Sequence, residues 1–363
     1  MTDRKYLRLM LILLIVLLAV MGFRYWRANQ DGGGKTITVT DCLDRRVQVP
    51  AKVERVACLY AFAGYATAML GQGDKIVAVP DDLKQDVLLN EIYPDISRAL
   101  VPVAEGSIDI EELLKADPDV VLVKNSTAAD PAEAKKLEKS NIPYLAVDYS
   151  GIEEQQHAVT VIAQALGAAE RGKLYNDYYQ NCIYKVRKVA ATIPEAERVR
   201  VYRATDEATD TDGPDTLAAD WTQTAGAINV SVDQPLRHFG GKNSASLEQI
   251  LQWDPDVILV NEPETAKYIS GSFRWSLLKA VKESRVYQMP GGISRWGNAE
   301  GVETPLAVMW TAHLLYPERF PDINIKQEAQ DFYQKIFNYQ VSGDMLDIIL
   351  NGEGMCGQNE QPG

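Results

Sequence analysis

The chain has 363 residues, of which 46% are apolar and 24% charged, as in an ordinary globular protein. This composition excludes a disordered chain, a collagen-like chain and a protein with many membrane spans. A net charge of −13 repels phosphate backbones, so we expect no nucleic-acid partner. At roughly 150 residues per domain, the length predicts two domains.

The N-terminus carries an export signal. Arg4, Lys5 and Arg8 precede an unbroken apolar run over 9–23, and a basic end of this kind stays in the cytoplasm. At about 1.5 Å per residue the run reaches only ~22 Å, which is short of a ~30 Å bilayer core. Residues 1–30 are predicted as an uncleaved membrane anchor or as a cleaved signal peptide, and we favour the anchor because Val20 and Gly22 match a cleavage site poorly. A flexible tether over 31–35 follows, which places the rest at the extracytoplasmic face of the cell membrane.

Four cysteines, Cys42, Cys58, Cys182 and Cys356, lie in this exported part, where disulfides can persist. Their spacing fits no metal motif, and their number allows three pairings among which the sequence does not choose. A chain of this size has core enough without cross-links, so buried thiols are the favoured alternative.

The first lobe is predicted over 36–150. Short apolar runs at 55–59, 75–79, 120–123 and 144–147 predict strands, with a helix near 64–70. Continuous runs of this kind are typical of parallel sheets that are buried on both faces. Linking helices follow over 151–195. The apolar spacing in 169–192 predicts one helix about 35 Å long, which would act as a stiff strut or else lie on the surface of one lobe.

The second lobe is predicted over 196–340, with a C-terminal tail over 341–363. Strands are expected at 199–202, 227–232, 257–260 and 285–288, and helices at 305–315 and 327–339. The sequence therefore predicts an α/β fold of two Rossmann-like lobes with mainly parallel sheets, joined by a long rigid α-helix.

An internal repeat supports this division. Segments 107–123 and 244–260 are identical at nine of 17 positions, 137 residues apart. In each copy a capping residue, Asp109 or Ser246, precedes a short apolar helix face, and an Asp-Pro pair ends the helix before a buried strand. One helix–strand unit thus occurs once in each lobe.

The carboxyl ends of parallel strands meet at the cleft between such lobes, which is where ligands bind. The candidate ligand-binding residues there and in adjoining loops are Tyr60, Asn125, Tyr149, Arg203, Trp221, Arg237, His238, Arg295 and Trp296. Aromatic and guanidinium groups suit a large flat or anionic ligand, whereas packing in the core or pairing on the surface is the alternative for each. The sequence contains no G-x-S-x-G, H-E-x-x-H, P-loop or G-x-G-x-x-G motif, so no enzymatic activity is expected.

Three features of the sequence are typical of a known protein family. They are the paired segments E-x-[IL]-L-x-x-D-P-D-V-[IV]-L-V, the long central helix and the stretch 296–305. Over about 36–340 the chain resembles the class III substrate-binding proteins of ABC importers. The resemblance implies a monomer that binds an iron chelate (siderophore or haem) or cobalamin in the cleft. The protein would deliver this ligand, unchanged and without a cofactor of its own, to a membrane permease with a cytoplasmic ATPase.

The same resemblance implies that Glu111 and Glu248, at matching positions of the repeat, dock onto arginines of the permease. The alternative is that each merely complements its helix dipole. The chain departs from the family pattern because no lipid-attachment cysteine follows the apolar run. A two-lobe enzyme and a ligand sensor that uses the same cleft remain alternative functions, and the strut predicts small lobe movements.

Overall fold

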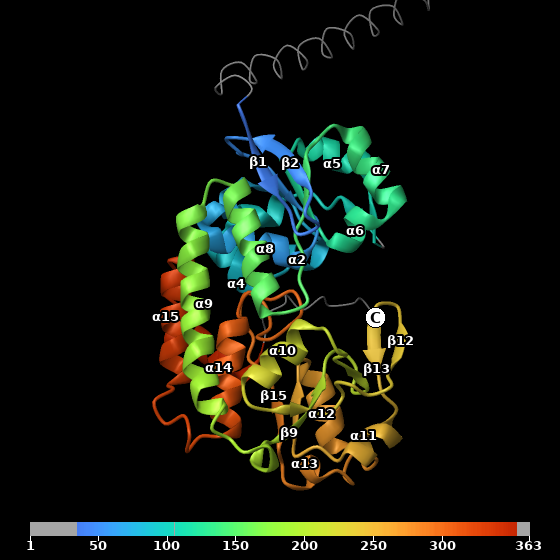
Figure 1. Cartoon of the computed structure of the whole chain (residues 1–363), viewed down its shortest axis with the longest axis vertical. Coiled ribbons are helices and arrows are strands. Elements are labelled where there is room, and N and C mark those ends of the chain that lie inside the picture. Colours follow the sequence, from blue (N-terminus) through green and yellow to red (C-terminus); the bar gives the residue numbers. More distant parts are fainter. Residues whose placement is uncertain (1–34, 105, 354–363) are drawn as a thin grey trace, which may run out of the picture.

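The computed structural model describes residues 35–104 and 106–353 as two α/β lobes beside a set of long helices (Figure 1). The predicted anchor over 1–30, residues 31–34 of the tether and Cys356 lie outside the described residues. Each lobe contains a four-stranded parallel sheet, so the predicted fold class is confirmed.

The N-terminal sheet has the order β4-β3-β7-β8, and every pairing in it is parallel. Its strands are β3 (Val56–Cys58), β4 (Ile76–Ala78), β7 (Val120–Val123) and β8 (Tyr144–Ala146), close to the predicted runs. The helices of this lobe are α2 (Ala61–Thr67), η1 (Ala68–Gln72), η2 (Gly73–Lys75), α3 (Asp81–Lys84), α4 (Val87–Ile92), η3 (Pro94–Arg98), α5 (Ile110–Ala116), α6 (Asn125–Ala129) and α7 (Pro131–Ser140). Two antiparallel hairpins, β1 (Thr36–Thr40) with β2 (Arg46–Pro50) and β5 (Val103–Ala104) with β6 (Ser107–Ile108), were not predicted.

The C-terminal sheet has the order β11-β9-β14-β15. Its strands are β9 (Arg200–Ala204), β11 (Ile228–Asn229), β14 (Val257–Val260) and β15 (Val286–Gln288). In both lobes the second strand along the chain lies outside the first, followed by the third and fourth, so the two sheets share one topology. A separate antiparallel sheet, β10 (Asp210–Thr211), β13 (Lys242–Ser244) and β12 (Arg237–Phe239), was not predicted. The helices of this lobe are η4 (Glu195–Glu197), α10 (Leu217–Thr224), α11 (Leu247–Trp253), α12 (Pro263–Gly271) and α13 (Lys279–Lys282).

The repeat folds as predicted in each lobe. The Asp109 side chain accepts two amide protons in the first turn of α5, and Ser246 forms a reciprocal capping box with Gln249 at α11. Both helices end at an aspartate with left-handed backbone, Asp117 or Asp254. The following strands, β7 and β14, are wholly buried and lie in two different sheets.

The lobes are joined by more than one helix. The predicted strut is α9 (Ala169–Ala190), which packs along α8 (Ile152–Ala165) and α14 (Thr304–Leu315). Helix α15 (Ile325–Phe337) packs on η1 of the N-terminal lobe, where Arg171 donates to the carbonyl oxygens of Met69 and Ile336. Ordered structure then continues through α16 (Gly343–Asn351), where the amide of Gly291 donates to the Ile349 carbonyl at 2.8 Å.

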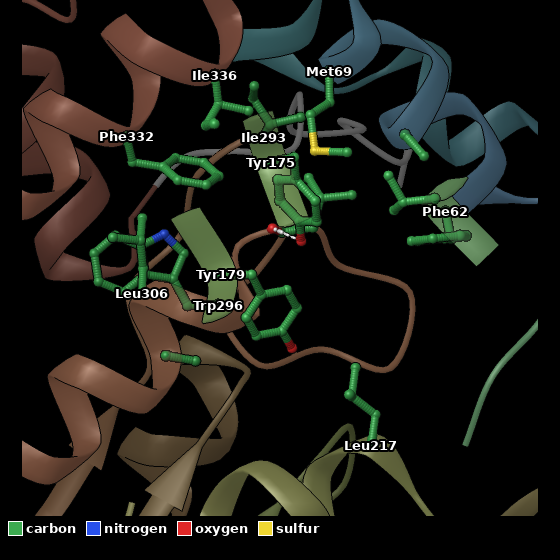
Figure 2. Close-up of a cluster of buried hydrophobic side chains, with 14 of the residues drawn as sticks. Phe62, Met69, Tyr175, Tyr179, Leu217, Ile293, Trp296, Leu306, Phe332 and Ile336 are labelled. Atoms are coloured by element: carbon green, nitrogen blue, oxygen red, sulfur yellow. Dashed lines mark hydrogen bonds between the residues drawn. The ribbon is translucent and has the colours of Figure 1, made fainter. Parts of the chain in front are cut away.

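One buried hydrophobic cluster extends across both lobes, and two smaller clusters lie within one lobe each. Figure 2 shows Phe62 and Met69 of the N-terminal lobe in one cluster with Tyr175, Trp296 and Phe332. Because protein interiors are close-packed, separating the lobes here would open cavities at high cost. Both lobes and their linking helices therefore share one rigid centre.

The described cysteines are free thiols. Cys58 and Cys182 are buried, and Cys42 is partly exposed. Burial raises the pKa of the Cys58 and Cys182 thiols to about 12, which makes them unreactive at neutral pH. For Cys58 and Cys182 the structure supports the buried-thiol alternative rather than a disulfide.

Candidate functional site

The site lies where the carboxyl ends of the two sheets face each other. In the N-terminal lobe Tyr60 follows β3, and Lys124 and Asn125 follow β7. In the C-terminal lobe Asn261 and Glu262 follow β14. In both sheets the first and third strands are neighbours, and the chain reverses its order there, which makes this the expected ligand-binding edge of a parallel sheet.

Glu300 joins the two lobes across this cleft. Its Oε2 accepts the amide proton of Ala61 at 3.1 Å, at the start of α2. Its Oε1 forms an ion pair with the Lys124 ammonium. Nearby, the Tyr149 hydroxyl donates to the Ala299 carbonyl oxygen at 2.8 Å. The loop after β15 thus reaches the N-terminal lobe through a carboxylate and a carbonyl.

Two predicted ligand residues, Arg203 and Trp221, bind that loop from the interior of the C-terminal lobe. The Arg203 guanidinium donates to the Gly297 carbonyl at 2.9 Å, and the Trp221 indole donates to the same oxygen at 3.1 Å. Arg203 also donates to Asn261 Oδ1 and pairs with Asp212, and it lies over the Trp221 ring. Because Arg203 is 1% exposed and Trp221 is 0% exposed, neither side chain reaches the cleft surface in this structure.

Trp296 is also fully buried. Its indole contacts the Tyr333 hydroxyl at 3.5 Å, and that hydroxyl donates to Glu303 Oε1 at 2.8 Å. Glu303 also accepts from the amides of Ile293 and Ser294 and from the Ser294 hydroxyl. Burial raises the pKa of the Glu303 carboxyl to about 7. This network anchors the loop after β15 to α15.

Arg295 faces the cleft in an ion pair. Its guanidinium binds both carboxylate oxygens of Glu262, at 3.0 and 3.1 Å, and donates to the Asn261 carbonyl at 2.6 Å. The Arg295 side chain is 19% exposed and that of Glu262 40%. Bidentate pairing of this kind fixes the plane of the guanidinium at the edge of the C-terminal lobe.

Tyr60, Asn125 and Tyr149 come together in the N-terminal lobe. The Tyr60 ring lies 5.5 Å from the Lys124 ammonium, and the Tyr149 ring packs edge-on against Phe62. The Tyr60 hydroxyl and the Asn125 Oδ1 are buried polar atoms without a hydrogen-bond partner in the described residues. Asn125 and Tyr149 line a hollow of about 350 Å³ together with Cys42, Asp148, Ser150, Glu154 and His157.

The structure does not bring Arg237 and His238 to this group. Both lie exposed on β12, in the hairpin at the edge of the C-terminal lobe (Figure 1). The His238 Nδ1 is 3.1 Å from Asn243 Oδ1 on the neighbouring strand β13.

A larger hollow of about 980 Å³ borders the linking helices. It lies between the start of α8, α10 and β11, and it shares Ser150 and Glu154 with the smaller hollow. Its lining carries more acidic than basic side chains, with Arg187 and Arg198 as the cations. This hollow contains none of the predicted site residues.

The two predicted docking glutamates are exposed and lie in different lobes. Glu111 and Glu248 occupy the first turns of α5 and α11. Glu248 has a distant cationic neighbour, with Arg274 Nη2 at 4.0 Å from its Oε1. Neither carboxylate is committed to a buried contact, so both are accessible to a partner.

Sequence reasoning missed Lys124 and Glu300. Lys124 directly follows the predicted strand 120–123, and the strand-end rule could have found it had the candidates begun one residue earlier. Glu300 lies in an irregular loop that carries no periodic pattern. Only the folded chain brings it to a lysine 176 positions away.

The family model of the periplasmic binding proteins matches residues 56–291, well over half of the chain. The chain belongs to the periplasmic binding protein family. The molybdate-binding protein MolA of Haemophilus influenzae is 26% identical over 334 residues, which cover 84% of this chain and 92% of the relative. The uncharacterized ABC transporter substrate-binding lipoprotein YvrC of Bacillus subtilis is also 26% identical, over 86% of this chain and 97% of its own.

Among solved structures, a periplasmic solute binding protein from Veillonella parvula superposes with a TM-score of 0.75. It is 25% identical, and the match covers 87% of this chain and 97% of that protein. These findings confirm the resemblance drawn from the repeat. The protein is an extracytoplasmic solute-binding component of an ABC transporter, which implies a membrane permease as partner, and this family is not enzymatic.

The membrane anchor predicted over 1–30 lies outside the described residues. Within 35–104 and 106–353, none of the helices has both the length and the apolar character needed to cross a bilayer.

Proposed function

We propose that this protein captures an anionic, metal-containing small molecule between its lobes and delivers it to the permease. The observation that carries the proposal is the charge pattern of the cleft. Lys124 and Arg295 are the cations at its two edges, and each is already paired with a glutamate. A negatively charged ligand would bind in the same way as these carboxylates.

The burial of the aromatic side chains favours some of the ligand classes predicted from the sequence over others. Corrin and porphyrin rings bind best against exposed aromatic faces, but Trp221 and Trp296 are fully buried and bonded to the protein. An anionic ferric chelate therefore fits better than cobalamin or haem. A metal oxyanion is a second candidate, favoured by the 26% identical relative that is named as molybdate-binding.

We propose that Tyr60, Asn125, Tyr149 and Arg295 contact the ligand, and that Arg203, Trp221 and Trp296 position the loop that faces it. Glu111 and Glu248 would dock onto permease arginines, since they are exposed at matching positions of the two lobes. Residues 1–30 would keep the protein at the membrane, where a tethered monomer meets the permease at high effective concentration.

Calorimetric titration tests the ligand class. The purified exported part is titrated with ferric citrate, molybdate, haemin and cyanocobalamin, while tryptophan fluorescence and the visible spectrum are recorded. We expect saturable one-to-one binding of ferric citrate or molybdate. Binding of cyanocobalamin in preference to both anions would contradict the proposal.

A further inference from the structure

The position of Glu300 suggests a second role for the cleft, which rests on the proposed function only for the charge of the ligand. We propose that Glu300 is an internal competitor of the anionic ligand. Its carboxylate pairs with Lys124 and links the cleft edges of the two lobes until a ligand anion replaces it at the lysine.

Glu300 contacts two groups of the N-terminal lobe, the Ala61 amide and the Lys124 ammonium. One carboxylate oxygen accepts the Ala61 amide proton and the other pairs with Lys124, so both oxygens face the N-terminal lobe. By contrast, Glu262 uses both oxygens on Arg295 within its own lobe. Among these two cleft carboxylates, only Glu300 links the lobes.

The loop that carries Glu300 is held on both sides. Arg203 and Trp221 bind the Gly297 carbonyl, and the Gln155 amide binds the Gly301 carbonyl at 2.8 Å. The Tyr175 hydroxyl of α9 donates to the Val302 carbonyl at 2.8 Å. A surface glutamate on a free loop contributes little to stability, but this one is presented by a fixed backbone.

A buried polar group beside the ion pair lacks a hydrogen-bond partner in the described residues. The Tyr60 side chain is 6% exposed, and its hydroxyl has no hydrogen-bond partner in the described residues. A buried hydroxyl without a partner costs free energy, which a ligand oxygen would recover. The ligand would therefore replace the Glu300 charge at Lys124 and add contacts that Glu300 does not make.

Two variants separate the charge of Glu300 from its link between the lobes. Glu300→Gln removes the charge, and Glu300→Ala removes both the charge and the link. Glu283→Gln is the matched control, because Glu283 is exposed and caps the end of α13, a helix at the end of the C-terminal lobe that points away from the N-terminal lobe (Figure 1). Molybdate is the probe anion, and hydrogen–deuterium exchange of the peptide that contains Ala61 and Phe62 reports the link.

We expect Glu300→Gln to bind molybdate about 10-fold more tightly than the unaltered protein, as for loss of one competing charged hydrogen bond. Glu300→Ala should also exchange the Ala61 amide faster, while Glu283→Gln changes neither measurement. Unchanged exchange in Glu300→Ala would overturn the link, and unchanged or weaker molybdate binding in Glu300→Gln would overturn the competition.

The exchange measurement uses no ligand, so it distinguishes the two proposals. If none of the proteins binds molybdate or ferric citrate, the proposed ligand class fails and the competition fails with it. Faster exchange in Glu300→Ala would still support the link between the lobes in that case.

Discussion

The Arg203 guanidinium and the Gly297 carbonyl oxygen lie 2.9 Å apart and join the first strand of the C-terminal sheet to the loop that crosses the cleft. The charge of Arg203 is balanced by Asp212, which is also buried. Arg203 is therefore a fixed part of the interior, and its hydrogen bond to Gly297 fixes the position of the loop over 297–301.

Replacing Arg203 with lysine should destabilise the protein. Lysine keeps the charge but cannot reach Gly297, Asn261 and Asp212 at once, which leaves buried polar groups unpaired. We expect a loss of about 2–4 kcal/mol in the free energy of unfolding, measured by urea titration. A loss below about 0.5 kcal/mol would show that the network carries little stability.

Gly297 should tolerate no side chain. Its φ is +75°, and a Cβ there would lie 2.6 Å from the Trp221 ring. Gly240→Ala is the matched control, because Gly240 has a φ of +58° but open space around it in the exposed hairpin. We expect Gly297→Ala to lower the melting temperature clearly more than Gly240→Ala, since only the former adds a clash to the backbone strain. Equal shifts would mean that the loop can move away from Trp221.

Glu303 should make the protein less stable as the pH rises. Its pKa in the folded protein is about 7, above the ordinary value of 4.5, so the folded chain binds more protons than the unfolded chain between these values. The stability that this group contributes is fully present below pH 4.5 and is lost as the pH rises through 7. The difference amounts to about 3 kcal/mol.

Urea unfolding at pH 5 and pH 8 checks this expectation. Glu303→Gln should be less stable at pH 5, where the Glu303 carboxyl is largely protonated. The hydroxyl oxygen of the acid can still accept a proton from Ile293, Ser294 or Tyr333, whereas the amide nitrogen that takes its place can only donate. It should also lose less stability than the unaltered protein between the two pH values. An identical pH dependence in both proteins would contradict the raised pKa.

Much of the fold could be predicted because its signals are local. The runs at 120–123 and 257–260 are continuous and apolar, and the caps Asp109 and Ser246 mark the helices before them. The hairpins β1–β2 and β12–β13 were missed because their strands are short, largely exposed and carry little alternation.

The site was harder to predict than the fold. Strand-end rules located the cleft edges at Tyr60 and Asn125, but they do not say which way a side chain points. Arg203 and Trp221 could be identified as buried only after the loop over 297–301 was placed against them. Ligand contacts form between distant segments, so they depend on tertiary structure that a single sequence does not contain.

Glu111 and Glu248 should be needed for transport and not for binding. We expect the double variant Glu111→Lys/Glu248→Lys to bind ligand normally but to lose uptake, because like charges would then face each other at the permease. The control is Glu170→Lys/Glu318→Lys, which makes the same charge change at exposed positions in the first turn of α9 and shortly after α14. Uptake of radiolabelled ligand in cells that carry the permease measures the effect, and normal uptake by the first variant would end the docking hypothesis.

The central claim is that the two lobes capture a solute and hand it to a permease. Stimulation of the ATPase of the reconstituted permease, with and without the ligand identified by titration, tests it most directly. The account predicts that the loaded protein stimulates ATP hydrolysis and drives ligand uptake into the vesicles. Normal ligand binding without either effect would contradict the account and favour a ligand sensor.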